Sequence, residues 1–348
     1  MSARFLFDLV EPAVLTEYVR AFDNEVLRNQ FALDQFLPAF ENSELEYSID
    51  QSSWMDVDAA VYRAFDTQPP MTGRQGISRL RGELAPVSRQ IPLTEEERLR
   101  LRAIREGGSA NQAQVDQIYA DAERMVRSVQ ARLELARGQV ITTGKFTLAG
   151  ENGLTMEADY NMPGSHKPTA AITWATASTD ILADLLTWMQ LYVDDNGFEP
   201  GLMMMSRTIL GYMINNTKMR EAAAWGGTTP SRINLETVQA ILSANGLPPV
   251  MIYDTQVRVS GVATRVIAAD KLTFLPPTEV PLGRTHYGVT AEALALAEAG
   301  KIVESAMPGI VAVNLRNDSP VQTFTLATAL AIPVLGNPNA IICADVVP

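Results

Sequence analysis

The stretch from residue 45 to residue 92 constrains the fold most, because it has the pattern of paired strands but little with which to build a core of its own. Apolar and polar side chains alternate at Leu45, Tyr47 and Ile49 and again from Met55 to Val61, which is the period of a β-strand. An isolated hairpin is marginal in water, and loops longer than about 12–15 residues are uncommon unless functional. We therefore expect something outside the subunit to cover this segment.

Arginine is concentrated in and after this stretch, although the chain is acidic. The segment RQGISRLRGELAPVSRQIPLTEEERLRLRAIREGG (residues 74–108) has arginine every few positions and no lysine or histidine. The whole chain has 28 basic against 40 acidic residues and a formal net charge of −12. Proteins that coat nucleic acid need an excess of Lys and Arg, so most of this surface is unsuited to that role. We interpret the partner of these arginines as another copy of the chain.

The first 44 residues are acidic and indicate an arm that docks elsewhere. Pro12 can open a short helix whose apolar face is Leu15, Val19 and Phe22. Asp8 interrupts the short apolar run before it, so this N-terminus lacks the pattern of a signal peptide. No apolar run approaches the roughly 20 residues that cross a bilayer, so we expect no membrane partner.

A long helix is predicted next. Thr94 and Glu97 form a capping box, and Gly107-Gly108 ends or breaks that helix. A second segment carries an amphipathic stripe to about Arg137, made of Val115, Ile118, Ala122, Met125, Val129, Leu133 and Ala136. A core-facing helix of any α/β protein would show the same stripe. Residues 145–160 then predict a β-hairpin with an Asn-Gly turn.

The rest of the chain predicts a compact α/β lobe with a β-rich end. A helix capped by Ser178 or Thr179 and stopped by Gly197 precedes the buried strand LMMMS, and helices near 207–216 and 234–244 come after it. At 348 residues the chain exceeds the size at which single cores stop growing, so we expect two or more folding units.

No catalytic, metal or cofactor site is predicted, and we expect no enzyme. GQVITTGK (residues 138–145) resembles a phosphate-binding loop, but its spacing is wrong and it lies between helix and strand. His166 reads as a solvated turn residue, and His286 as a loop or interface residue. Asp194-Asp195 reads as a solvated helix end, and Cys343 as a buried small hydrophobe.

Three segments together resemble the major capsid proteins of tailed bacteriophages, the HK97-like fold, and within it the lambda-type capsid protein E family. They are LRGELAPVSRQI, TMEADYNMPGSHKPTAAITWATASTDILADLLTWMQLYVDDNGFEPGLMMMSRTILGYMINN and NDSPVQTFTLATALAIPVLGNPNAIICADVV. Their order and spacing over most of the chain carry the resemblance.

The resemblance implies an α+β HK97-like fold with an N-terminal arm, an extended β-hairpin loop, a long spine helix, a peripheral domain and an axial domain. By that mapping the arm is 1–44, the extended loop 45–92, and the peripheral domain 93–175 with its spine helix at 94–137. The axial domain is 176–308, residues 309–335 return to the peripheral domain, and 336–348 form a last strand of the axial domain.

The resemblance also implies a structural function. Hexamers and pentamers of the chain would self-assemble into an icosahedral virion shell in the host cytoplasm and enclose double-stranded DNA without sequence-specific contact. Separate scaffold, portal and cement or decoration proteins are expected as partners. An encapsulin-like cargo shell and, less favoured, a soluble α/β enzyme remain as alternatives.

In this family the extended loop lies across a neighbouring subunit, which predicts intersubunit contacts. The arginines are Arg63, Arg74, Arg79, Arg81 and Arg89, the acidic groups Asp34, Glu41 and Glu44, and the apolar anchors Trp54, Tyr62 and Phe65. Some members of the fold weld subunits through a lysine of this loop. Residues 45–92 contain no lysine, so we expect non-covalent reinforcement instead.

Overall fold

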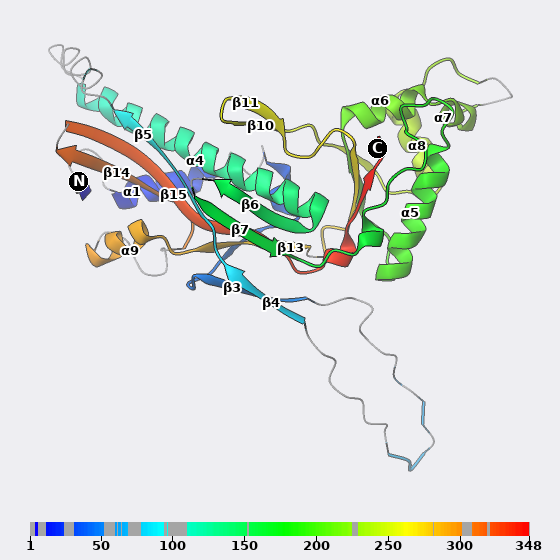
Figure 1. Cartoon of the computed structure of the whole chain (residues 1–348), viewed down its shortest axis with the longest axis horizontal. Helices are drawn as coiled ribbons and strands as arrows, with labels where there is room; N and C mark the ends of the chain where they lie inside the picture. Colours follow the sequence, from blue (N-terminus) through cyan, green and yellow to red (C-terminus); the bar gives the residue numbers. More distant parts are fainter. Residues whose placement is uncertain are drawn as a thin grey trace. The chain divides into compact units, whose positions relative to one another are not determined.

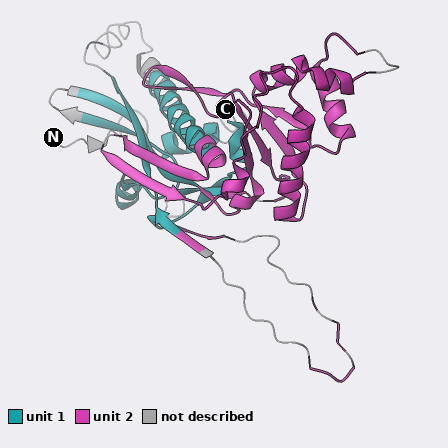
Figure 2. Cartoon of the chain, turned by 45° about the vertical axis from the view of Figure 1, so that its right-hand side comes forward, with its two compact units in different colours: residues 1–47, 81–137, 284–333 teal, residues 48–80, 138–283, 334–348 magenta. Residues whose placement is uncertain are grey.

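The computed structural model describes residues 4–5, 12–23, 31–51, 60, 62–63, 65–68, 78–93, 96, 110–151, 153–224, 229–280, 282–300, 308–318 and 321–347. The α+β chain forms two compact units (Figure 2). Unit 1 contains residues 1–47, 81–137 and 284–333, and unit 2 contains residues 48–80, 138–283 and 334–348.

Unit 1 is built around a six-stranded sheet whose strands come from distant parts of the sequence (Figure 1). Across the sheet these are β1 (Arg4–Phe5), β14 (Val311–Asp318), β15 (Val321–Leu335), β13 (Gly283–Gly288) and β2 (Ala39–Glu41), while β5 (Pro86–Leu93) also pairs with β15. The long strand β15 pairs antiparallel with both β14 and β5, and β13 pairs parallel with β2.

β5 differs from what its sequence pattern alone predicts. That pattern assigns residues 86–92 to the coreless extended loop, but the structure pairs them with β15. The pairing satisfies one edge of the β5 backbone and half-buries Val87, Ile91 and Leu93. The two-stranded segment is correspondingly shorter than expected.

The described part of the predicted N-terminal arm packs against the rest of unit 1. Helix α1 (Pro12–Phe22) begins at Pro12 as predicted, buries Leu15 and Val19, and contacts β14. The Thr16 hydroxyl donates to the Ala312 carbonyl at 3.2 Å. The short 3₁₀ helix η2 (Ala32–Gln35) comes next in the chain. Helix α9 (Ala291–Glu298), which precedes β14 in the sequence, also packs against that strand.

The long helix α4 (Ala110–Thr143) confirms the predicted stripe but not its end. Val115, the first residue of the stripe, has a side chain outside the described part of the structure, and the other six are all buried: Ile118, Ala122, Met125, Val129, Leu133 and Ala136. The expected end at Arg137 is wrong, because Val140 and Ile141 extend the buried face and the helix stops only at Gly144, whose φ is +69°. Gly138, inside the helix, lies close to the backbone of Val266. A Cβ at position 138 would lie 2.5 Å from the Val266 carbonyl oxygen. The capping box at Thr94 and Glu97 lies outside the described residues.

Unit 2 contains a four-stranded sheet in the order β16 (Ile342–Asp345), β12 (Lys271–Leu275), β8 (Leu202–Met205) and β9 (Val250–Ile252). Its helices are α5 (Ile181–Asn196), α6 (Arg207–Asn215), α7 (Thr217–Ala222) and α8 (Leu235–Ala244), with short 3₁₀ helices η5 (Gly164–His166) and η7 (Pro338–Ala340). The hairpins are β6 (Lys145–Glu151) with β7 (Leu154–Asp159), as predicted, and β10 (Gln256–Val259) with β11 (Val262–Arg265).

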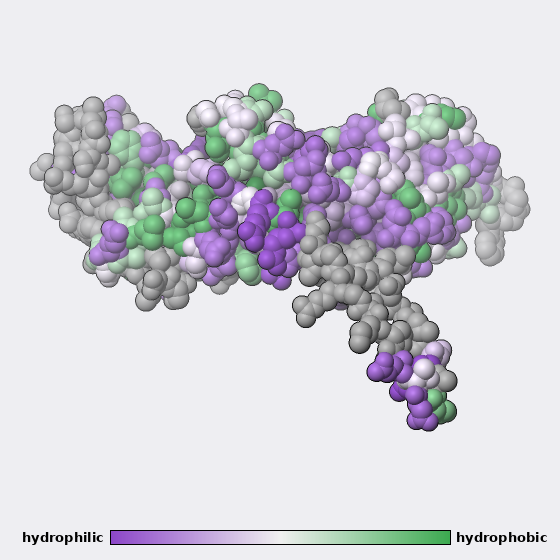
Figure 3. Space-filling model, turned by 60° about the horizontal axis from the view of Figure 1, so that its bottom comes forward, coloured by the Kyte–Doolittle hydropathy of each residue, from purple (hydrophilic) through white to green (hydrophobic). Residues whose placement is uncertain are grey.

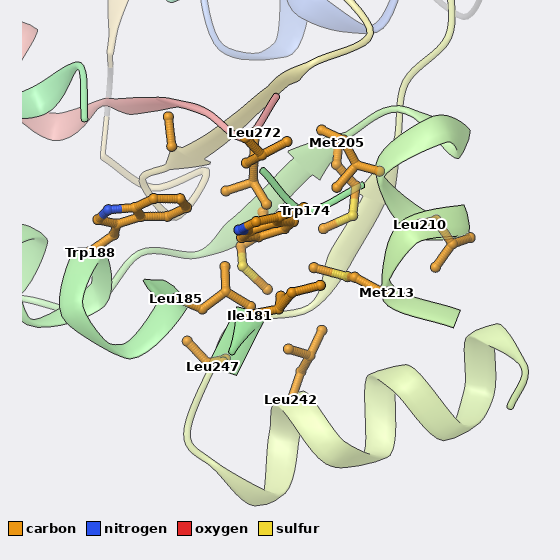
Figure 4. Packing of buried hydrophobic residues seen from close by; sticks show 14 of the residues in the cluster. Trp174, Ile181, Leu185, Trp188, Met205, Leu210, Met213, Leu242, Leu247 and Leu272 are labelled. Carbon is orange, nitrogen blue, oxygen red and sulfur yellow. The ribbon is translucent and has the colours of Figure 1, made fainter. Parts of the chain in front are cut away.

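The core of unit 2 gathers helices and strands around two tryptophans (Figure 4). The rings of Trp174 and Trp188 stack with centroids 5.8 Å apart, and Met205, Met213 and Leu272 lie around Trp174. The predicted N-cap residue of α5 is wrong. The side chain of Asp180, not that of Ser178 or Thr179, accepts a hydrogen bond from the Ala183 N–H. Its predicted stop at Gly197 is confirmed, with φ +74°.

Both histidines are buried, which corrects their assignment to solvated or loop positions. His166 is 0% exposed, so it is not a solvated turn residue. Its ring forms a hydrogen bond with Asp195, so Asp195 is not merely a solvated helix end. His286 is 4% exposed on strand β13, with its ring against Phe40 and Tyr47. The neighbouring residues in the chain indicate neither environment, because the covering residues lie far away in the sequence.

Candidate intersubunit surface

Within the described ranges, no group of three or more His, Cys, Asp or Glu side chains could hold a metal ion. The helices of that part of the chain include none long and apolar enough to span a bilayer. Cys343 is buried as predicted, and burial raises the pKa of its thiol to about 11. The distinctive surface features lie on the extended segment and near its root.

We call the residues between β3 (Glu46–Gln51) and β4 (Ser78–Glu83) the extended segment. These two strands pair with each other and form its root. Tyr47 of β3 is only 2% exposed and lies over Gly82 of β4. A Cβ at position 82 would be 2.6 Å from the tyrosine oxygen and 2.7 Å from a ring carbon, so glycine leaves the room that the ring needs. The Leu84 N–H donates to the Leu45 carbonyl at 3.0 Å. The root is therefore packed and hydrogen-bonded.

Further out, Arg79 forms a bidentate ion pair with Asp50, with Nε to Oδ1 at 2.6 Å and Nη2 to Oδ2 at 3.1 Å. Both side chains are about half exposed, so solvent screens the pair and it contributes little to stability. Gln51 Nε2 donates to the Tyr160 carbonyl at 3.0 Å and so ties β3 to the end of the β6–β7 hairpin.

The tip of the segment presents aromatic rings to solvent. Tyr62 is 103% exposed and Phe65 is 99% exposed. Arg63 donates to the Thr67 carbonyl at 2.6 Å across a turn in which Asp66 has φ +65°. Among the coloured atoms at the far end of the segment, a small hydrophobic area is set in hydrophilic surroundings (Figure 3). The turn is closed by its own polar groups, which leaves both rings free to contact another molecule.

The remaining charged candidates divide between exposed and engaged side chains. Arg81 and Arg89 are exposed, and the described residues offer neither of them an ion-pair partner. Glu41 and Glu44 are exposed on the arm. Trp54 and Arg74 lie outside the described residues.

Asp34 is engaged within its own chain. Its carboxylate accepts from Arg137 at 2.7 Å and is 15% exposed, while Arg137 is 1% exposed and also bonds to Glu134. Burial alone would lower the pKa of Arg137, but Tyr287, Asp34 and Glu134 raise it above its ordinary value. The pair therefore fixes η2 to α4 inside unit 1.

This arrangement of an exposed aromatic tip on a packed root suits contact with a second protein. A family model described as phage major capsid protein E matches residues 11–346. This chain belongs to the phage major capsid protein E family. It is therefore a shell-forming capsid protein, found in the virion, and the family's role is structural.

Solved structures agree with this capsid protein fold. A prophage protein of Escherichia coli CFT073, assigned as a capsid protein, has a TM-score of 0.63 at 15% identity, covering 99% of this chain and 100% of that one. A phage-related protein of Bordetella bronchiseptica RB50 has a TM-score of 0.58 at 13% identity, covering 97% of each chain. No protein among the curated sequences matches the chain.

The capsid family assignment confirms the main sequence-based interpretation, a phage major capsid protein. Sequence reasoning missed the root formed by Tyr47 and Gly82. A glycine inside a strand opposite an aromatic was the available signal, since glycine in a strand often marks a close approach.

Proposed function

We propose that this capsid protein assembles as hexamers and pentamers into an icosahedral shell around packaged double-stranded DNA, with the extended segment of one subunit lying across its neighbour. The exposed tip carries this proposal. A monomer gains nothing from holding Tyr62 and Phe65 fully in water, whereas burial of one such ring contributes about 1.5–3 kcal/mol. Aromatic anchors of this kind dominate protein interfaces.

Charge supports the same contact. Arg81 and Arg89 lie exposed near the root, and Glu41 and Glu44 of a neighbour's arm offer the opposite sign. Each exposed pair contributes about 0–1 kcal/mol, so such pairs set orientation rather than affinity. Asp34 is excluded from this contact set because Arg137 already engages it.

The wider assignments come from the family. We infer an arm at 1–44, an axial domain at 176–308 completed by the last strand, and a peripheral domain at 93–175 that includes the spine helix and is completed by residues 309–335. Scaffold, portal and cement proteins are separate partners, DNA is held without sequence-specific contact, assembly takes place in the host cytoplasm, and the chain has no catalytic role.

The test is assembly of the double variant Tyr62→Ser with Phe65→Ser. We expect the yield of closed particles, measured by sedimentation and electron microscopy, to fall at least tenfold. The melting temperature of the free subunit should stay within about 1 °C, because both rings are already in water.

Val262→Ser is the matched control, since Val262 is 65% exposed on β11 and lies outside the proposed contact. Its particle yield should equal that of the wild type. A wild-type yield of particles from both the double variant and this control would refute the role of the tip. A loss of particles from both variants would show that reduced solubility, not loss of the tip contact, prevents assembly.

A further inference from the structure

His166 occupies a position that its local sequence does not predict. It ends η5 in unit 2 and is 0% exposed. Its Nδ1 lies 2.8 Å from the carbonyl oxygen of Ile341, and its Nε2 lies 2.6 Å from Oδ2 of Asp195. The ring thus bridges the end of α5 and the chain just before β16.

Both atoms that face the ring are hydrogen-bond acceptors. A carbonyl oxygen cannot donate, and a carboxylate oxygen accepts. A neutral imidazole has one N–H, so one of its nitrogens would face an acceptor with a lone pair. A doubly protonated ring satisfies both contacts, and a charge-assisted bond to a carboxylate is the stronger kind.

We propose that His166 is held as an imidazolium and acts as a protonation-dependent clamp that fixes the C-terminal strand to α5. The clamp is complete while the ring carries both protons. It loses one of its two bonds when rising pH removes a proton from the ring.

The clamp acts on a segment that other α5 side chains also hold. Tyr192 donates its hydroxyl to the Ala340 carbonyl at 3.2 Å, and Asn196 donates to the Asn339 carbonyl at 2.9 Å. With His166, three successive carbonyls before β16 are therefore held from the α5 side.

The strand that comes after this segment is part of the core. Ile342, Ala344 and Val346 are all 0% exposed within the unit 2 cluster. The Ala170 N–H donates to the Asp345 carbonyl at 2.8 Å, and the Trp174 N–H donates to the Val346 carbonyl at 3.0 Å. Release of the clamp should therefore loosen β16 and the segment before α5 together.

The charged groups around the clamp are few among the described residues. On α5, Asp195 touches the ring, whereas Asp194 accepts from Gln190. Lys167 lies directly after His166 in the chain, and on the strand side Asp345 pairs with Lys271 at 2.7 Å. Tyr192 and Cys343 remain neutral because burial raises the pKa of each far above neutrality.

Two measurements on the full-length chain test the proposal. The chain has two histidines, so ¹⁵N-histidine labelling gives two pairs of ring nitrogen signals, and a His286→Gln variant assigns them. Magic-angle-spinning NMR of sedimented protein should show both nitrogens of His166 protonated at pH 6–7. One protonated and one bare nitrogen throughout that range would place the proton on Asp195 and overturn the proposal.

Hydrogen exchange provides the second readout. After correction for the intrinsic rate, protection of residues 339–347 should fall at least tenfold when the pH rises far enough to deprotonate the ring. Asp195→Asn should already show the lower protection at pH 6–7 and lose this pH dependence. Asp194→Asn is the matched control and should behave as the wild type. Identical exchange in the two variants would refute the clamp.

Discussion

At the residue scale, His286 is the clearest titratable group whose environment determines its charge. It is buried in β13 against two aromatic rings, and neither ring nitrogen has a hydrogen-bond partner among the described residues. Burial, and to a smaller extent Arg284, lowers the pKa of His286 to about 4. The imidazole is therefore neutral in the folded protein near neutral pH.

This environment predicts acid sensitivity of the subunit. Below pH 6.5 His286 is protonated in the unfolded chain, whereas in the folded chain it is protonated only near pH 4. The contribution of the neutral, buried His286 to the free energy of unfolding is therefore complete above pH 6.5 and is lost as the pH falls toward 4. The loss should be on the order of 2 kcal/mol. Urea unfolding at pH 7 and pH 4.5 measures it. His286→Phe should show a smaller difference between the two pH values, and an unchanged difference would contradict the assignment.

At the element scale, the root of the extended segment depends on one missing side chain. Gly82→Ala places a Cβ within 3 Å of the Tyr47 ring, which must then move out of its buried position. Overpacking of this kind costs about 1–3 kcal/mol. Differential scanning fluorimetry of the subunit should show the loss, and the variant should also give fewer particles.

Gly211→Ala in α6 is the control for this substitution. Nothing lies within 4 Å of the added Cβ, and alanine is favoured over glycine in a helix by about 1 kcal/mol. That variant should be as stable as the wild type or more so. If both alanine variants behave alike, the close approach at Gly82 has no energetic role.

The elements also show which contacts can be inferred from a linear sequence. Helices α1, α4 and α5, strand β8 and the β6–β7 hairpin are predictable from apolar periodicity, caps and turn residues, all of which act within a few positions of the chain. The pairing of β5 with β15 joins residues more than two hundred positions apart, and no local pattern encodes such a partner.

At the scale of the whole molecule, the proposed contact between arm and extended segment predicts a charge-reversal cycle. Arg81→Glu with Arg89→Glu should raise the concentration needed for assembly, and so should Glu41→Arg with Glu44→Arg. The four substitutions combined should restore assembly in part, because opposite charges then face each other again.

Light scattering at low and high salt measures these effects, and the differences should shrink at 0.5 M salt because the Debye length falls. Arg124→Glu reverses a 69% exposed arginine of α4 outside the proposed contact and should leave assembly unchanged. Failure of the combined variant to recover any assembly would argue against direct pairing of these groups.

The lack of lysine between residues 45 and 92 leads to a prediction about the finished shell. A loop lysine cannot weld neighbouring subunits in this protein, so boiled particles should run as one band near 38 kDa in SDS gels. A ladder at multiples of that mass would show a covalent link of another kind.

For this chain, the order of the amino acids is enough to predict the α+β class, the position of most helices and hairpins, and membership of the capsid family, because periodicity and segment order are linear properties. Three features are decided only in the folded chain. They are the burial of His166 and His286, the ion pair between Asp34 and Arg137, and the packing of the Tyr47 ring on Gly82. Burial and partnership depend on residues that folding brings together from distant positions, and each side chain's chemistry depends on that environment.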